Sequence, residues 1–144
     1  MTLTPKTVYA EDVPYFQTSQ SSADTWIDRA KAEIIGINGK INAEAFGSDA
    51  TGRAAFMLSF NIGNELYKVI WPVLQSKLGK DKAAKIQSAT ALYHDIKARV
   101  VSAKFLGARN AFFGYMLLDN GQTVSQATNA DFMAQIPLLM SGKE

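Results

Sequence analysis

The sequence contains no cysteine, and histidine occurs only once, as His94. The absence of cysteine excludes disulfides, thiolate metal sites, iron–sulfur clusters and cysteine nucleophiles. The single histidine excludes any site that needs two imidazoles from one chain. No apolar run approaches the roughly 18 residues of a membrane-spanning helix, and polar side chains interrupt the most apolar window, residues 54–74. We therefore expect no membrane contact.

The chain has 144 residues, of which 47% are hydrophobic, and this is enough material for one domain with a core of its own. Its first residues lack the charged and then apolar segments of a secretory signal. Pro5, Pro14 and a polar run after Tyr15 and Phe16 indicate an N-terminal arm over residues 1–20 that packs on the core or on a neighbouring subunit. The sequence predicts a soluble, cytoplasmic protein with this arm and one helical domain over residues 21–144.

Charge is spread unevenly along the chain, although the net charge is only +2. Residues 65–110 carry nine basic and three acidic side chains, a net charge of +6, and each flanking segment carries a net charge of −2. Such a basic block is a common feature of surfaces that bind anions. The commoner explanation of such a block is a solvated face that keeps an apolar protein soluble.

The apolar pattern predicts an all-α fold, a bundle or orthogonal array of roughly four to five helices. Apolar residues at spacings of three and four, from Trp26 to Ala45, predict a helix over residues 23–45. A competing interpretation is that Asn38-Gly39 forms the tight turn of a hairpin. A second helix is expected over residues 51–78, kinked at Pro72, because apolar residues surround it on most sides.

The third helical region is expected over residues 82–118, with Gly107 as a bend or a break. The sequence does not show whether this region is one helix or two. Thr128 and Asp131 resemble a capping pair that introduces a short final helix. The short link after residue 78 predicts an antiparallel helical hairpin, and its basic residues make a helix-turn-helix one interpretation.

Two sets of residues are candidates for binding. An aromatic stripe with adjacent polar side chains could contact a ligand or a partner, and its members are Phe56, Phe60, Asn61, Glu65, Tyr67 and Trp71. A basic cluster could contact phosphates if nucleic acid is bound, and its members are Lys77, Lys80, Lys82 and Lys85.

Catalytic chemistry finds little support in the sequence. His94 is followed by Asp95, but adjacent helical residues point in different directions, and no serine lies in a Gly-x-Ser-x-Gly turn. A haem site on His94 is not expected either, because the segment 82–101 shows no break after it. We expect no catalytic residues, no metal site and no cofactor, and the sequence does not show whether His94 or Glu65 has a role.

The leading hypothesis is a non-catalytic binding or interaction protein that acts through an apolar helix surface as a homodimer. One alternative is a nucleic-acid-binding protein that uses the basic segment 77–109. Another is a protein that binds a small apolar ligand in an aromatic-lined pocket.

Overall fold

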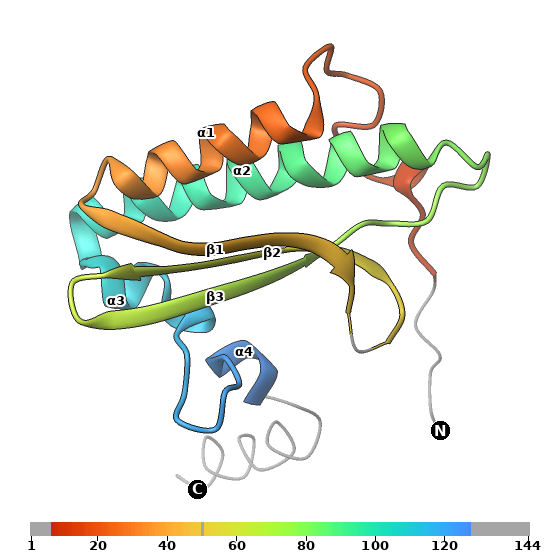
Figure 1. Ribbon diagram of the computed structural model, residues 1–144. Helices are drawn as coiled ribbons and strands as arrows, with labels where there is room; N and C mark the ends of the chain where they lie inside the picture. Colours follow the sequence, from red (N-terminus) through yellow and green to blue (C-terminus); the bar gives the residue numbers. More distant parts are fainter. Residues whose placement is uncertain (1–6, 50, 128–144) are drawn as a thin grey trace, which may run out of the picture.

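The computed structural model describes residues 7–49 and 51–127, and it shows helices packed on a three-stranded antiparallel sheet (Figure 1). The all-α prediction is therefore wrong. The elements in chain order are η1 (Ala10–Asp12), α1 (Ala23–Ile35), β1 (Gly39–Ser48), β2 (Ala54–Ile62), β3 (Glu65–Pro72), α2 (Asp81–Leu106), α3 (Ala108–Ala111), η2 (Phe113–Tyr115) and α4 (Val124–Ala127).

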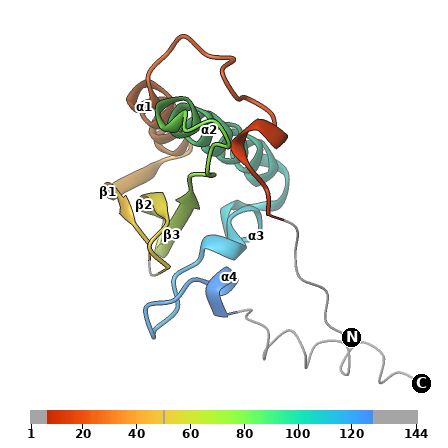
Figure 2. The same cartoon turned by 90° about the vertical axis from the view of Figure 1, so that its right-hand side faces the viewer.

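The sheet has the order β1-β2-β3, and α1 and α2 lie side by side on one of its faces (Figure 2). β1 pairs with β2 from Gly39 opposite Ile62 to Ser48 opposite Ala54. β2 and β3 are joined by a two-residue turn in which Gly63 has a φ of +61°, a conformation that glycine adopts without steric cost. No helix of the described residues is both long and apolar enough to cross a membrane.

The helix expected over residues 51–78 is instead the hairpin of β2 and β3. Phe56 and Phe60 are four residues apart, a spacing that places two side chains on one side of a helix and also of a strand. In the structure they lie on the face of β2 that packs against the helices, together with Leu58 between them. Pro72 is the last residue of β3 and kinks no helix.

The helix expected over residues 23–45 ends at Ile35, and a turn over 36–38 leads into β1. Asn38 has a φ of 67° in this turn. A Cβ at Gly39 would lie 2.4 Å from Ile34 Cγ2, so only glycine fits where the strand leaves the helix. Asn38-Gly39 therefore lies at a turn, as the competing interpretation expected. The turn joins the helix α1 to the strand β1, however, and not two strands of a hairpin.

The long region after residue 81 divides at Gly107. α2 ends at Leu106 and α3 begins at Ala108, with Gly107 at a φ of +87° between them, which confirms the predicted break. The apolar block that follows is not helical to residue 118, because Met116 forms a β-bridge with Tyr67 of β3. A strand precedes the basic link, so the predicted helical hairpin and its helix-turn-helix interpretation are wrong.

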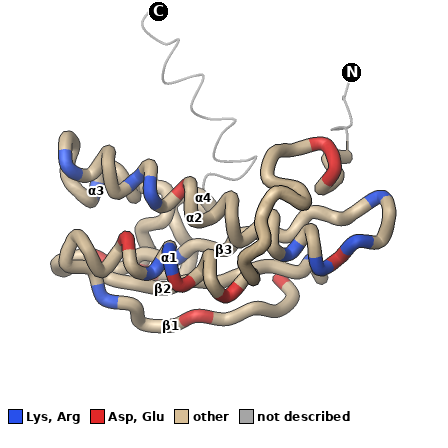
Figure 3. Tube along the Cα trace, turned by 90° about the horizontal axis from the view of Figure 1, so that it is seen from above, with Lys and Arg blue, Asp and Glu red and all other residues tan. Residues whose placement is uncertain are grey.

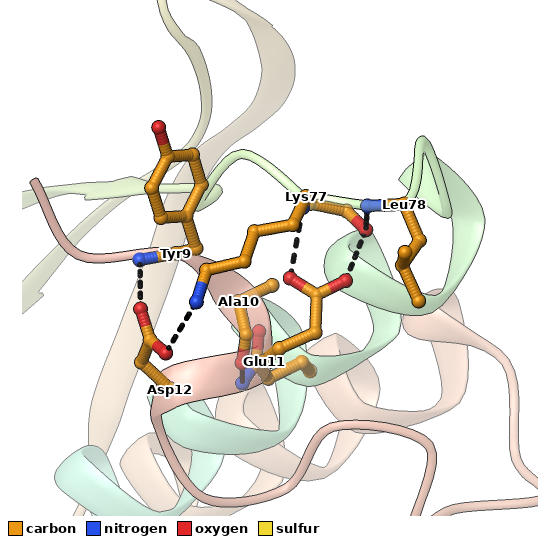
Figure 4. A network of polar contacts seen from close by, with 8 residues as sticks. Tyr9, Ala10, Glu11, Asp12, Lys77 and Leu78 are labelled. Atoms are coloured by element: carbon orange, nitrogen blue, oxygen red, sulfur yellow. Dashed lines mark hydrogen bonds and ion pairs between the residues drawn. The ribbon is translucent and has the colours of Figure 1, made fainter.

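Residues 7–20 of the N-terminal arm pack on the core, which is one of the two arrangements that the sequence left open. Ala10 is fully buried, and its amide donates to the carbonyl of Gln75 at 2.9 Å. The Glu11 carboxylate accepts hydrogen bonds from the Ser76 hydroxyl at 2.6 Å and from the Lys77 amide at 2.9 Å (Figure 4). These bonds hold the pKa of Glu11 below its ordinary value, with that from Ser76 as the largest cause.

The predicted final helix after Thr128 lies outside the described residues.

The core lies between the sheet and the two long helices, and Tyr67 is its largest fully buried side chain. The ring of Tyr67 packs on Phe60 at 5.5 Å and on Phe112 at 5.8 Å. Its hydroxyl is buried and has no hydrogen-bond partner among the described residues. Burial raises the pKa of Tyr67, because the charged phenolate would lose its hydration.

Tyr67→Phe should leave the free energy of unfolding unchanged or raise it by up to about 1 kcal/mol, because it removes a polar group that is buried without a partner. Urea unfolding measures the difference. The matched control is Tyr115→Phe, since the Tyr115 hydroxyl donates to Asp95 Oδ2 at 2.6 Å and its loss should cost about 1.5 kcal/mol. A cost at Tyr67 equal to that at Tyr115 would contradict the interpretation.

Candidate functional site

A groove opens at the end of the molecule where the β1–β2 loop, the segment after β3 and the beginning of α2 meet. Its volume is 1080 Å³, which exceeds that of a pocket for a drug-sized ligand. The lining residues come from these three segments, from the adjoining ends of β1 and β2, and from the arm. They are Thr7, Val8, Phe46, Arg53, Ala54, Val73, Leu74, Gln75, Asp81, Lys82, Ala84 and Lys85. We refer to it as the cationic groove.

Three basic side chains line the cationic groove, Arg53, Lys82 and Lys85, against one acidic side chain, Asp81. None of the three forms an ion pair within residues 7–49 and 51–127. The amino-terminal end of α2 also borders the groove, and the unpaired amides of a helix start carry partial positive charge. Asp81 and the nearby Asp49, whose pKa the charge of Arg53 helps to lower, offset part of this charge, and the groove keeps an excess of basic over acidic lining residues.

Phe46 places an aromatic ring in the same groove. The residue is 45% exposed, and its ring lies 4.8 Å from the ring of Phe56 at an interplanar angle of 55°. The ammonium of Lys85 lies 4.0 Å from the centre of the Phe46 ring, within the range of a cation–π contact. β1 supplies the ring and α2 supplies the ammonium, so the contact exists only in the folded protein.

The predicted basic cluster is divided by the structure. Lys82 and Lys85 line the cationic groove, whereas Lys80 and Lys82 line a neighbouring hollow of 610 Å³. Lys77 lies apart from them, with its ammonium 3.1 Å from Asp12 Oδ1 and 5.4 Å from the centre of the Tyr9 ring. In Figure 3 several Lys and Arg positions follow one another along the link between β3 and α2, with an acidic position among them, and others are spread over the rest of the molecule.

The predicted aromatic and polar set is not gathered in one pocket. Phe56, Phe60 and Tyr67 are buried in the core. Asn61 and Glu65 lie next to the turn between β2 and β3, where Glu65 Oε1 is 3.8 Å from Arg109 Nε.

Trp71, the last member of that set, is half-buried and lines a separate cavity of 420 Å³ beneath the arm. The other lining residues are Val13, Pro14, Tyr15, Pro72, Leu74, Gln87, Ser88 and Ala91. Gln87 and Ser88 are the two polar residues among them, and both already donate hydrogen bonds to backbone carbonyls. This cavity is where a small apolar ligand would fit.

No catalytic grouping appears among the described residues. His94 stacks on Tyr15 at 4.8 Å, whereas the Asp95 carboxylate accepts from Arg99 at 2.9 Å and from Tyr115 at 2.6 Å. Burial, followed by the bond to Asp95, raises the pKa of Tyr115 far above its ordinary value, so its hydroxyl stays protonated. The part of the chain that the structure describes holds no group of three or more side chains suited to a metal ion.

Phe46 and Arg53 were missed from the sequence, and both belong to the β1–β2 hairpin. An expected helix over 23–45 and a second one over 51–78 leave no reason to bring them near Lys85. The available signal was the turn chemistry of residues 47–53, where Gly47, Asp49 and Gly52 separate two apolar stretches.

No protein-family model, no curated protein and no solved structure matches this chain.

Proposed function

We propose that this protein binds nucleic acid and holds its phosphates in the cationic groove. The observation that carries the proposal is the convergence of Arg53, Lys82 and Lys85, without ion pairs in the described part of the chain, on one groove. Basic side chains of this kind bind phosphates and release the counterions condensed on a nucleic acid.

The extent of the positive surface favours a polymer over a single small anion. Lys82 lines both the cationic groove and the neighbouring hollow, and Lys80 lines the latter. Basic residues therefore continue from Arg53 past the beginning of α2, with Asp81 as the acidic residue among them. A chain of regularly spaced phosphates could contact this whole surface, whereas a single small anion would use only part of it.

The test is fluorescence anisotropy of a labelled oligonucleotide over a range of salt concentrations. With three phosphate contacts on a single strand, the logarithm of the binding constant should fall with the logarithm of salt at a slope of about −2. The triple variant R53Q/K82Q/K85Q should bring this slope close to zero and weaken binding at least about tenfold at low salt.

The matched control is K40Q/K97Q/K104Q, which removes the same number of positive charges from exposed positions outside the groove. It should retain most of the affinity and of the salt slope. Equal losses in the two triple variants would mean that net charge, and not this groove, binds the oligonucleotide. Absence of binding by the unmodified protein at low salt would refute the proposed function.

The predicted homodimer stays a prediction, although its original argument no longer holds. The apolar helix surface that was to form the interface does not exist, because residues 54–72 form strands whose apolar side chains contribute to the core. A different surface is available, because β1 pairs with one neighbour in the sheet and such edges can pair with a second chain. A native mass spectrum of the purified protein would report the number of subunits.

A further inference from the structure

We infer that the cationic groove takes single-stranded nucleic acid, with a base stacked on the ring of Phe46. This inference rests on the proposed function, and it adds which form of nucleic acid binds. It is carried by a geometric feature that phosphate binding alone does not need, an exposed aromatic ring among the basic side chains.

The surroundings of Phe46 suit a stacking platform. Phe56 packs against the ring at 4.8 Å and belongs to the core at 5% exposure, so it holds Phe46 in place from the protein side. Phe46 itself is 45% exposed. Because every base has a π-face, a ring of this kind accepts bases with little regard to their sequence.

Lys85 gives the free protein a contact that a base can replace. Its ammonium lies 4.0 Å from the centre of the ring, where it interacts with the negative face of the π-system. A base that stacks there displaces the ammonium, which sits on a flexible stem and can turn to a phosphate. Lys85 thus exchanges a cation–π contact for a charge-assisted hydrogen bond, and its charge is partnered in both states.

A duplex does not meet these requirements. Its bases are paired and stacked inside the helix, so a base reaches a protein ring only after unstacking, at a cost of a few kcal/mol. A single strand exposes its bases and can bend into a groove. The two forms share phosphate chemistry, so a preference between them reports on the stacked base.

The first experiment compares three fluorescent probes of equal length at one salt concentration: a thymidine strand, an abasic strand and a duplex. The abasic strand carries the phosphates without the bases. The thymidine strand should bind roughly 5- to 150-fold more tightly than the abasic strand, which is the gain in affinity expected from stacking one base on an aromatic ring. The duplex should bind more weakly than the thymidine strand.

The second experiment uses Phe46→Leu, which keeps an apolar side chain at a half-exposed position and removes the ring. Its matched control is Phe113→Leu, since Phe113 is 50% exposed and lines none of the cavities described above. Phe46→Leu should abolish the preference for thymidine over abasic strand while the salt slope stays unchanged. Phe113→Leu should alter neither.

The outcomes separate this inference from the proposed function. Equal affinity for the thymidine and abasic strands, with a salt slope near −2, would overturn base stacking and leave nucleic-acid binding intact. Tighter binding of the duplex would overturn it as well. No binding of any probe would refute the proposed function, and the inference would fail with it.

Discussion

Phe60→Ala should lower the free energy of unfolding by about 3–5 kcal/mol, the largest effect that we expect from a single substitution. Phe60 is fully buried on β2, and its ring packs on Tyr67 at 5.5 Å and edge-on against Phe112 at 5.6 Å. The three rings join the sheet to the segment after α3. Alanine would leave a cavity that β2, paired on both sides, cannot close. Urea unfolding followed by circular dichroism measures the change.

The matched control is Phe113→Ala, which removes the same ring from a position that is 50% exposed. Its cost should stay below about 1 kcal/mol, since a half-exposed ring contributes less buried area. A similar cost at the two positions would show that Phe60 does not lie in the core as described. If Phe60→Ala does not fold, Phe60→Leu provides a milder test of the same packing.

Gln87→Ala should lower the free energy of unfolding by about 2 kcal/mol and release the N-terminal arm from α2. Gln87 is 3% exposed, and its Nε2 donates its two hydrogens among the carbonyls of Ala10, Val13 and Pro14, at 2.8, 3.1 and 2.9 Å, so that one hydrogen is shared. No other side chain of the described residues contacts the arm with so many hydrogen bonds. Alanine would remove this donor from all three carbonyls, and within the described residues only that of Ala10 keeps a backbone bond, from the Val13 amide at 3.3 Å. Turning toward water would then supply new hydrogen-bond partners for the carbonyls of Val13 and Pro14.

Amide hydrogen exchange checks this prediction more directly than stability does. The Ala10 amide donates to the Gln75 carbonyl and should exchange much faster in Gln87→Ala, while amides in the middle of α2 keep their protection. Gln75→Ala is the matched control, because its side chain is exposed and only its backbone carbonyl holds the arm. Unchanged exchange at Ala10 in Gln87→Ala would show that other contacts are enough to fix the arm.

The apolar spacing predicted a helix correctly where only a helix explains it. The prediction failed where the same spacing also fits one face of a strand. α1 begins at the expected residue, Ala23, and α2 begins at Asp81, one residue before the expected start. The Ser22 hydroxyl caps α1 by accepting a hydrogen bond from the Thr25 amide. Residues 54–72 were wrongly predicted as helical because a spacing of four places side chains on one face of a helix and also on one face of a strand. Which one forms depends on the turn at Gly63 and on packing against helices distant in sequence.

Only part of the cationic groove was predictable, because its residues come together through strand pairing that the sequence did not show. Lys82 and Lys85 lie close together in the sequence within a basic block, so their charge was visible without a structure. Phe46 and Arg53 reach them only through the pairing of β1 with β2, and an all-helical expectation contains no such pairing. The sequence therefore indicated two of the three basic residues of the groove and gave no indication of Arg53 or of the ring of Phe46 beside them.

The position of Thr7 and Val8 on the wall of the cationic groove has a consequence for fusion proteins. The six residues from Met1 to Lys6, at about 3.5 Å each, span at most roughly 21 Å. An affinity tag joined to Met1 would therefore stay within reach of the groove at an effective concentration in the millimolar range. An acidic epitope tag at that end would act as a tethered competitor and mask weak binding, whereas a polybasic tag would add positive charge beside the groove and imitate it.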